Sequence, residues 1–407
     1  MWAMRVAHLA DLHIGFRQYV RTAPGGMNQR EVDVSRAVAR AIDAVIAARP
    51  DVVVVAGDVF HQVRPSNPAI VFAVQQFLKL RTAFGPDVPI VVVAGNHDQP
   101  RATESGCILR VLKVLGITVV DAGPERHDFP HLGLSVLAVP DQLGAPLPLL
   151  APNADATHNL LVIHGEVPGL LPPERAEGER TVRQVPVEEL ERGRWDYVAL
   201  GHWHVHRQVA PRAWYAGAIE YTSNNTWLEI AEERKARLPG KGFVLHDLAT
   251  GAHEFVHVAS ERRLLDLEPV EAAGLAAAEV DERLAERVAA VKGGIDDAIV
   301  RLRVLDIPRV VARDLDQKRL QQWKRLALHM QVDTRRPELV SARSASGAAG
   351  ARPSLQDMVR EKLATRLLPG GVDRERFLAR GLDYLKSLDG AEPEPTDLLA
   401  PLGPEAS

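Results

Sequence analysis

Five apolar, β-branched runs occur in the first half of the chain, and each run ends in a short polar cluster. The runs are Val6 to Ala10, Val52 to Ala56, Ile90 to Ala94, Leu160 to Ile163 and Tyr197 to Leu200. Four or more consecutive apolar residues leave no solvated face, so we expect these segments to be buried parallel strands. Ligands that leave the carboxyl ends of neighbouring parallel strands meet in one crevice. The chain is therefore predicted to be an α/β protein with its chemistry at the strand exits.

The polar clusters are made of residue types that bind metals. They are Asp11-Leu12-His13, Gly57-Asp58, Gly95-Asn96-His97-Asp98, His164-Gly165 and Gly201-His202-Trp203-His204. Each cluster alone is a weak signal, because Gly-Asp after a strand is often only a turn. All five in order, each at a strand exit, favour a metal site over residues that merely cap helices. Imidazole and carboxylate together suit Mn, Fe or Zn better than Ca, which prefers oxygen ligands.

The charges of the clusters fit two divalent metal ions. Two such ions about 3.5–4 Å apart repel each other unless an anion lies between them, so one carboxylate has to bridge. Asp58 is the best candidate for the bridge. Metals of about +4, the carboxylates of Asp11 and Asp58 and a bridging hydroxide leave a centre of about +1. Such a centre attracts a phosphodiester anion, which indicates a two-metal phosphoesterase.

The residues around these clusters resemble the calcineurin-like metallophosphoesterases, and within them the double-strand-break-repair nuclease subunits of the SbcD type. The matching stretches are Ala7 to Tyr19, Asn28 to Asp33 and Gly57 to His61. Gly-Asn-His-Asp at Gly95 to Asp98 also differs from the Gly-Asn-His-Glu of the protein serine/threonine phosphatases. The resemblance is good over residues 4 to about 225, loose to about 335 and poor beyond.

The resemblance implies a role for each residue of the clusters. One metal would take Asp11, His13, Asp58 and His204, and the other would take Asp58, Asn96, His164 and His202. His97 would face the phosphate, stabilise the transition state and help to protonate the leaving oxygen, with Asp98 orienting its imidazole. His61 matches a family histidine beside the substrate, and a residue at a helix start near the cleft rim is the alternative. The expected metal is manganese.

Breaks in composition predict the domain organisation. We expect a phosphoesterase domain over residues 1–260, built as two mixed β-sheets sandwiched between helices, and a small α/β cap over residues 261–340. Further expected elements are helices over 31–48, 67–82, 276–290 and 314–328, the last with Asp314 as N-cap, and strands over 213–221, 242–248, 253–258, 298–304 and 329–332. Residues 105–115 also have a helical pattern.

The C-terminal part follows a different pattern. Residues 341–352 are rich in Ala, Ser and Gly and are predicted to be a flexible linker. Apolar residues then recur along one side of two helices over residues 353–389, separated by Pro369-Gly370-Gly371, and residues 390–407 read as a disordered acidic tail. This helical hairpin has two apolar stripes to bury. It docks either on its own core or on a coiled-coil partner; the resemblance implies the coiled coil of an SMC-like ATPase, and a homodimer.

Charge and composition limit the remaining alternatives. Residues 301 to 386 hold 19 Lys or Arg against 10 Asp or Glu, in a chain of net charge −4. This basic segment is either a solvated helical surface or a binding surface for DNA or an acidic protein. The single cysteine excludes a thiolate metal cage and suits a reducing cytosol. Without a signal peptide or an apolar run of 18, we expect a cytoplasmic, nucleoid-associated protein with no membrane contact.

Three functions are compatible with these features. The first is a manganese-dependent DNA exonuclease, for which the resemblance implies 3′ to 5′ digestion, single-strand endonuclease activity and a bridging hydroxide as nucleophile. The second is a phosphodiesterase or phosphatase that acts on a small molecule. The third is a binding protein that has lost catalysis. The complete ligand set argues against the third, and the cap, basic segment and hairpin argue against the second.

Overall fold

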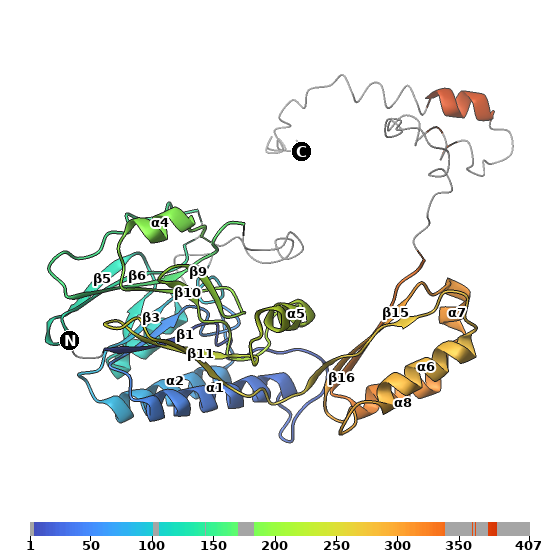
Figure 1. The fold of residues 1–407 in the computed structure, drawn as a ribbon, viewed down its shortest axis with the longest axis horizontal. Helices are drawn as coiled ribbons and strands as arrows, with labels where there is room; N and C mark the ends of the chain where they lie inside the picture. The colour runs from blue at the N-terminus through green and yellow to red at the C-terminus, as the bar shows by residue number, and fades with distance from the viewer. Residues whose placement is uncertain are drawn as a thin grey trace, which may run out of the picture. The chain divides into compact units, whose positions relative to one another are not determined.

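The computed structural model describes residues 4–100, 106–142, 144–169, 183–337 and 373–380, together with Arg360 and Leu363. The chain divides into two units, residues 1–337 and 338–407. The described residues of the first unit form three β-sheets (Figure 1). Among the described helices, none has both the length and the apolar character to cross a membrane.

The first sheet combines four parallel strands with an antiparallel edge. Its strands are β1 (Arg5–Leu9), β2 (Val52–Ala56), β3 (Ile90–Val93), β4 (Thr118–Val120), β11 (Gly242–Asp247) and β12 (His253–His257). They follow the order β12-β11-β1-β2-β3-β4, with β1 to β4 parallel and β11 antiparallel to both neighbours. The three N-terminal apolar runs are therefore adjacent parallel strands, as expected.

The second sheet has the same mixed character. It contains β5 (Glu125–Phe129), β6 (Leu134–Val139), β7 (His158–His164), β8 (Tyr197–Gly201), β9 (Arg207–Ala210) and β10 (Ala213–Tyr215). The order is β5-β6-β7-β8-β10-β9, in which β6, β7, β8 and β10 are parallel and the two edge strands are antiparallel. The remaining two apolar runs, β7 and β8, are neighbours in this sheet.

The two sheets lie face to face between layers of helices (Figure 1). Helices α1 (Gln29–Ala48) and α2 (Asn67–Phe84) and the 3-10 helix η2 (Ile108–Leu115) pack on the first sheet; α4 (Val187–Arg192) lies on the second, and η3 (Pro130–Leu132) precedes β6. Along β2, Val53 and Val55 face the helices while Val52 and Val54 face the second sheet. Both faces of the strand are buried, which explains its unbroken apolar sequence. The predicted fold class is confirmed.

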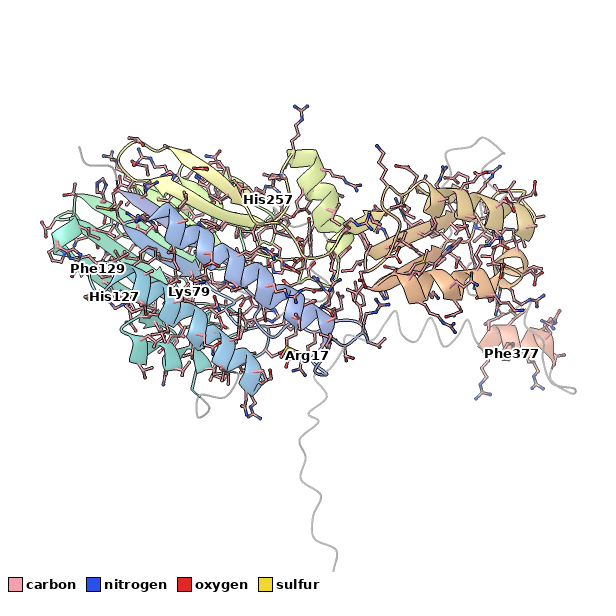
Figure 2. All side chains as sticks on the ribbon, turned by 90° about the horizontal axis from the view of Figure 1, so that it is seen from below. Arg17, Lys79, His127, Phe129, His257 and Phe377 are labelled. Carbon is pink, nitrogen blue, oxygen red and sulfur yellow. The ribbon has the colours of Figure 1, made fainter. Side chains whose placement is uncertain are left out.

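Side chains tie the helices of the outer layer together. Lys79 on α2 forms an ion pair with Asp43 on α1 (Figure 2). The first helix is anchored at its start by Arg30, which is buried and donates to Asp33 and to the carbonyl oxygen of Tyr221. Arg262 also donates to both carboxylate oxygens of Asp33. The Asn28 to Asp33 stretch therefore has a structural role in joining α1 to distant parts of the first unit.

The third sheet forms a small α/β module at the end of the first unit. Its strands are β13 (Leu264–Asp266), β14 (Val270–Glu271), β15 (Ile299–Leu305) and β16 (His329–Thr334). The other three strands each pair in parallel with β15. Helices α6 (Ala277–Ala289), α7 (Arg309–Arg313) and α8 (Gln317–Leu326) accompany it, and Leu284 and Leu320 join the apolar cluster beneath the sheet. Helix α5 (Thr226–Ala236) contacts this module through Trp227 and Ile230.

Two of the predicted elements are wrong in detail, and a third, the helical stretch over 105–115, is found as a shorter helix. The helix expected over 314–328 begins at Gln317, because Asp316 rather than Asp314 accepts the N–H groups of its first turn, at 3.0 Å from both Lys318 and Arg319. Asp314 instead ends α7. The strand expected over 213–221 stops at Tyr215, where Gly217 adopts a φ of +85°. Residues 108–115 form a 3-10 helix.

Only part of the predicted hairpin lies within the described residues. Arg360 and Leu363 are helical, and residues 374–380 form a helix that carries Phe377 (Figure 2). The Asp373 side chain accepts the N–H of Arg376 at 2.9 Å, which is an N-cap arrangement. The predicted linker, the acidic tail and most of the first hairpin helix lie outside the described residues.

A stack of aromatic rings at one edge of the sandwich includes three histidines. The rings of Trp214 and His253 stack at 3.9 Å, His206 stacks on Trp214, and His246 Nδ1 lies 3.2 Å from His253 Nδ1. Burial lowers the pKa of His246 to about 4, and burial together with His206 lowers the pKa of His253 to about 3. Both imidazoles are therefore neutral at pH 7 and serve as packing residues.

This stack predicts a pH-dependent stability. In the unfolded chain these histidines bind protons near pH 6.5, but in the folded chain they bind them only near pH 3–4. Their contribution is complete above pH 6.5 and is lost as the pH falls. We expect replacement of both His246 and His253 by Phe to flatten the fall in unfolding free energy between pH 7 and 5. The effect is at most about 1.4 kcal/mol per pH unit for each ring, and less for His253, which is partly exposed.

Urea unfolding at a series of pH values in EDTA measures this slope without metal binding. Replacing the exposed His131 by Phe is the matched control and should leave the slope unchanged. Equal slopes in the wild type and the His246/His253 double variant would contradict the prediction.

Candidate metal centre

Strand register brings the predicted site residues to one edge of the sandwich. Ala56 pairs with Val93, so the turns that carry Asp58 and Asn96 leave neighbouring strands at the same level. His164 pairs with Gly201, which places it beside the His202 turn. The N–H of Asp11 donates to Gly57 at 3.0 Å and the N–H of His202 donates to the Asp11 carboxylate at 3.1 Å. The second bond links the two sheets.

One half of the cluster consists of Asp11, His13 and His204, and the ligand atoms of this group lie within 4.8 Å of one another. His13 Nε2 lies 3.0 Å from His204 Nε2. His204 Nδ1 is 3.2 Å from a carboxylate oxygen of Glu229. A carboxylate only accepts, so Nδ1 of His204 carries the proton and its Nε2 presents a lone pair to His13.

The other half contains Asp11, Asp58 and His164, with Asn96 beside them. His164 Nδ1 donates to the carbonyl oxygen of Ala56 at 2.9 Å, and its Nε2 faces Asn96 Oδ1 at 2.9 Å. Asp58 Oδ2 lies 3.6 Å from His164 Nε2 and 3.8 Å from His13 Nε2. Asp58 therefore reaches both halves, and so does Asp11.

The electrostatics keep the ring nitrogens of His13 and His202 available as ligands. Burial lowers the pKa of His202 to about 3, and burial and neighbouring imidazoles hold the pKa of His13 well below its usual value. Burial alone would lower the pKa of His164, but the carboxylates of Asp58 and Asp11 raise it. Burial raises the pKa of Asp11 to about 6. Burial also acts to raise that of Asp58, yet the nearby His164 and His97 lower it overall.

These donor atoms fit divalent cations. The Nε2 electron pair of His204 lies 3.0 Å from His13 Nε2, and His164 Nε2 lies 2.9 Å from Asn96 Oδ1. In each pair both atoms can act as acceptors, and a cation or a proton between them satisfies both. The imidazoles have low pKa values or have their other nitrogen bonded, as histidine ligands of metals commonly do. The mixture of N and O donors suits Mn, Fe or Zn.

His61, His97 and His13 form a third group on the less buried side of the cluster. His97 Nδ1 donates to the carbonyl oxygen of His61 at 2.7 Å, and the His97 N–H donates to Asp58 Oδ1 at 2.9 Å. His61 and His97 are stacked with ring centroids 5.2 Å apart. Both rings therefore lie at the cluster, and the His61 carbonyl fixes the orientation of His97.

Asp98 does not contact the His97 ring in the way expected. Its carboxylate is fully buried and accepts the N–H groups of Val59, Phe60 and Gly95 at 2.9–3.1 Å. Burial and the nearby Asp58 raise the pKa of Asp98 to about 7. The residue pins the turn that carries His97 to the turn that carries Asp58. Because the carboxylate oxygens of Asp98 accept backbone N–H groups, Asp98 affects the His97 ring only indirectly, through the position of the turn.

Glycines in the motifs make room for these side chains. A Cβ at Gly57, which has a φ of +92°, would lie 2.2 Å from His164 Nδ1. A Cβ at Gly95 would lie 2.2 Å from Asp58 Oδ1. Asp11, His13, Asp58 and His202 themselves have positive φ angles between 46° and 109°. Strained backbone of this kind is common where function fixes the position of a side chain.

Sequence reasoning missed the residues behind His204. Glu229 and Glu233 on α5 and Lys241 before β11 are all buried and form an ion-pair network. No motif spacing marks them, since they come more than 20 residues after the last cluster. Two glutamates four residues apart on a helix usually lie on a solvated face. A lysine at the entrance to an apolar strand was the one available signal.

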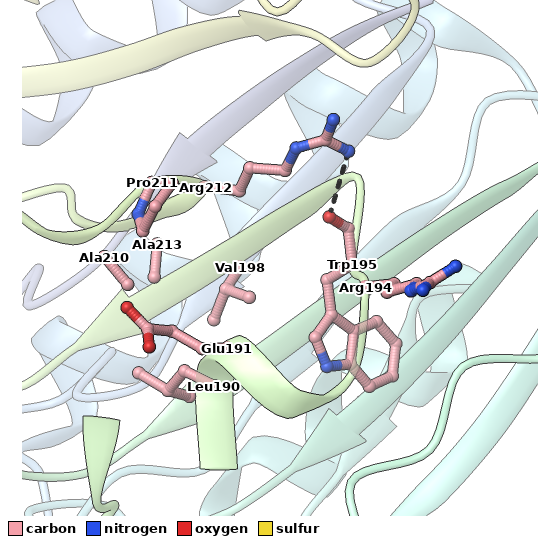
Figure 3. A pocket seen from close by; sticks show the side chains of 9 residues that line it. All are labelled: Leu190, Glu191, Arg194, Trp195, Val198, Ala210, Pro211, Arg212 and Ala213. Atoms are coloured by element: carbon pink, nitrogen blue, oxygen red, sulfur yellow. Dashed lines mark hydrogen bonds between the residues drawn. The ribbon is translucent and has the colours of Figure 1, made fainter. Parts of the chain in front are cut away.

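A cavity of about 530 Å³ lies away from this cluster, between α4 and the β9–β10 hairpin (Figure 3). It is lined by apolar side chains such as Leu190 and Val198, with Arg194 and Arg212 near its rim, and Arg212 donates to the carbonyl oxygen of Trp195. None of the predicted metal ligands lines it. We therefore place the candidate chemistry at the polar cluster and not in this cavity.

Comparisons with known proteins agree with this geometry. A family model described as calcineurin-like phosphoesterase matches residues 4–206. Residues 4–206 therefore form a domain of the calcineurin-like phosphoesterase class, which confirms the resemblance seen in the motifs.

Within that class the chain is similar to archaeal proteins named DNA double-strand break repair protein Mre11. The relative from Methanopyrus kandleri is 30% identical over 287 residues, covering 64% of this chain and 58% of the relative. That from Methanococcus maripaludis is 28% identical over 255 residues (60% and 63%), and that from Archaeoglobus fulgidus is 27% identical over 294 residues (65% and 61%). The chain thus spans about three fifths of the length of these relatives.

Proposed function

We propose that this chain is a manganese-dependent DNA exonuclease that digests 3′ to 5′, also cuts single strands and acts in double-strand-break repair. The observation that carries the proposal is the convergence of Asp, His and Asn side chains from five strand exits on one buried cluster. The names of the similar archaeal proteins support DNA as the substrate.

The residues divide into ligands for two metal ions. Asp11, His13, Asp58 and His204 would hold one ion, and Asp58, Asn96, His164 and His202 would hold the other. When bound, two such ions neutralise the charge on a phosphodiester and make water a nucleophile at neutral pH. Asp58 is the proposed bridge because its Oδ2 lies within 4 Å of a histidine from each half, at 3.6 and 3.8 Å.

His97 is proposed to act on the substrate and not on the metals. Its Nδ1–H is committed to the His61 carbonyl oxygen, so its Nε2 is the nitrogen that would meet the phosphate. A histidine in that place stabilises charge in the transition state and donates a proton to the leaving oxygen. Asp98 keeps the His97 turn against the Asp58 turn through its bonds to three N–H groups. His61 supports the His97 ring by stacking.

A small-molecule phosphodiesterase is the second candidate. It would use the same cluster, but it would not need the module over residues 264–334 or the basic segment. Positive segments that follow a catalytic domain favour a polyanionic substrate.

The test is to measure hydrolysis with Mn²⁺ of three substrates: a linear duplex, a closed circular duplex of the same sequence, and bis(p-nitrophenyl) phosphate. We expect loss of the linear duplex and sparing of the circular duplex. Hydrolysis of the small diester with both DNAs intact would establish the second candidate instead.

The proposed partner is the coiled coil of an SMC-like ATPase, with the nuclease itself as a homodimer. The motivation is the apolar stripes over residues 353–389, such as Leu355, Val359 and Leu363, which need a surface to cover them. Helix-on-groove docking uses stripes of this spacing.

Deletion of residues 341–407 is expected to abolish co-purification with the ATPase from the same genome. The truncated chain keeps every proposed ligand and catalytic residue, so it should still bind manganese and melt within a few degrees of the full-length chain. Co-purification and thermal melting of both forms are the measurements. Retained ATPase binding, or a loss of several kcal/mol of stability, would show that the hairpin belongs to the core.

A further inference from the structure

Helix α5 places a carboxylate directly behind one of the proposed metal ligands. We propose that Glu229 is a positioning residue for His204: its carboxylate holds the imidazole with Nδ1 protonated, so that Nε2 points into the metal centre. This inference rests on the proposed ligand role of His204. It extends that role to residues on α5 and before β11 that no motif identifies.

The hydrogen bond from His204 to Glu229 determines the tautomer. His204 Nδ1 lies 3.2 Å from Glu229 Oε1, and the carboxylate side chain is fully buried. The opposite ring nitrogen lies 3.0 Å from His13 Nε2. If Nδ1 lost its proton, two acceptors would face each other in a buried place, which is costly. The carboxylate therefore keeps the ring proton on Nδ1, so that the electron pair lies on Nε2. It also raises the basicity of Nε2.

Lys241 fixes Glu229 in turn. Its ammonium group is buried, pairs with the other oxygen of Glu229, and lies 2.9 Å from Glu233 Oε1. It also donates to the main-chain carbonyl oxygen of His204 at 2.8 Å. Burial alone would lower the pKa of Lys241, but Glu229 and Glu233 raise it, so the lysine is charged. One cation thus holds both the backbone of His204 and the carboxylate that orients its ring.

The helix that carries Glu229 is itself held in place. Asn225 caps its start by accepting the N–H of Leu228 at 3.3 Å. Trp227 and Ile230 pack in one apolar cluster with residues of the third-sheet module, and Trp227 Nε1 donates to Gln331 at 3.2 Å. Glu233, one turn after Glu229, accepts the hydroxyl of Tyr221 at 2.6 Å. Glu229 therefore approaches His204 from a rigid support, which a positioning residue requires.

The experiment compares two glutamates of the same network. Glu229→Gln removes the charge but keeps an acceptor, and Glu229→Met removes both. Glu233→Gln and Glu233→Met are the matched controls, because Glu233 also pairs with Lys241 through one carboxylate oxygen, while its other oxygen accepts the hydroxyl of Tyr221. Mn²⁺ binding to the full-length, metal-free chains is measured by calorimetry, with thermal melting alongside. We expect one of two Mn²⁺ ions to bind 10–100-fold more weakly in the Glu229 variants, more so for Met, as is usual for partners of metal ligands.

A purely structural network would give a different result. Equal changes in Mn²⁺ affinity for the Glu229 and Glu233 variants, or no change in either, would overturn the proposal.

A second measurement uses the wild-type chain and so does not depend on whether a variant folds. The ¹⁵N chemical shifts of His204 should show that Nδ1 is protonated. The Nε2-protonated form would overturn the proposal as well. Failure of the wild type to bind two Mn²⁺ would contradict the proposed function itself; loss of one ion in His204→Ala but not in Glu229→Met would contradict only the positioning role.

Discussion

Asp58→Asn is expected to lower phosphodiester hydrolysis by at least about 10³-fold and to weaken the binding of both metals. Two divalent ions about 4 Å apart repel each other by on the order of 15 kcal/mol at an effective dielectric constant of about 20. A bridging carboxylate offsets much of this repulsion and a neutral amide does not. The asparagine still accepts the N–H of His97 at Oδ1, so the turn should keep its shape.

Metal content and Mn²⁺ affinity of the purified variant, measured beside its activity, check this expectation. Asp141→Asn is the matched control, because Asp141 is also buried and accepts a backbone N–H, from Arg183 at 2.8 Å, but lies outside the groups of candidate ligands. It should retain two ions. An Asp58→Asn chain with both ions and full activity would show that the bridge is another group, and Asp11 would be the next candidate because it belongs to both groups of buried ligands.

His97→Gln is expected to reduce the rate of the chemical step by about 10²–10⁴-fold while leaving both metals and substrate affinity in place. Glutamine retains an N–H group for the His61 carbonyl oxygen but has no titratable nitrogen to donate a proton. Single-turnover rates and elemental analysis of the same preparation separate the two roles. Loss of a metal ion in this variant would instead make His97 a ligand, while an unchanged rate would exclude a catalytic role. His127→Gln, at a partly exposed residue of β5, should behave as wild type.

The fold was predictable from sequence where burial acts on both faces of an element. β2 and β7 read as strands because every residue of each is buried, a pattern that solvated strands do not produce. Edge strands carried less information. β5 begins with four charged or polar residues and β9 with two, most of them exposed, and neither strand is predicted from the sequence. The end of β10 depended on a turn at Gly217, where a Cβ would lie 2.8 Å from the His206 nitrogen, a contact between distant backbone segments that local sequence cannot reveal.

The candidate site was predictable to the extent that it uses motifs. Asp11 and Asp58 leave the adjacent parallel strands β1 and β2, so their grouping follows once these strands are identified. His164 joins them from the other sheet, which register within one sheet does not determine. The orientation of rings was not predictable. Asp98 follows His97 directly in sequence, yet its carboxylate turns to three backbone N–H groups, and a main-chain carbonyl orients the imidazole instead. Glu229 was missed because burial of a helical glutamate depends on tertiary packing and not on spacing.

An anomalous difference map from a crystal of the chain soaked in Mn²⁺ tests the central proposal most directly. The account predicts two peaks roughly 3.5–4 Å apart, with the Asp58 carboxylate between them and His204 and His164 on opposite sides. A single peak, or peaks that do not contact Asp58, would contradict the two-metal centre from which the proposed function is derived.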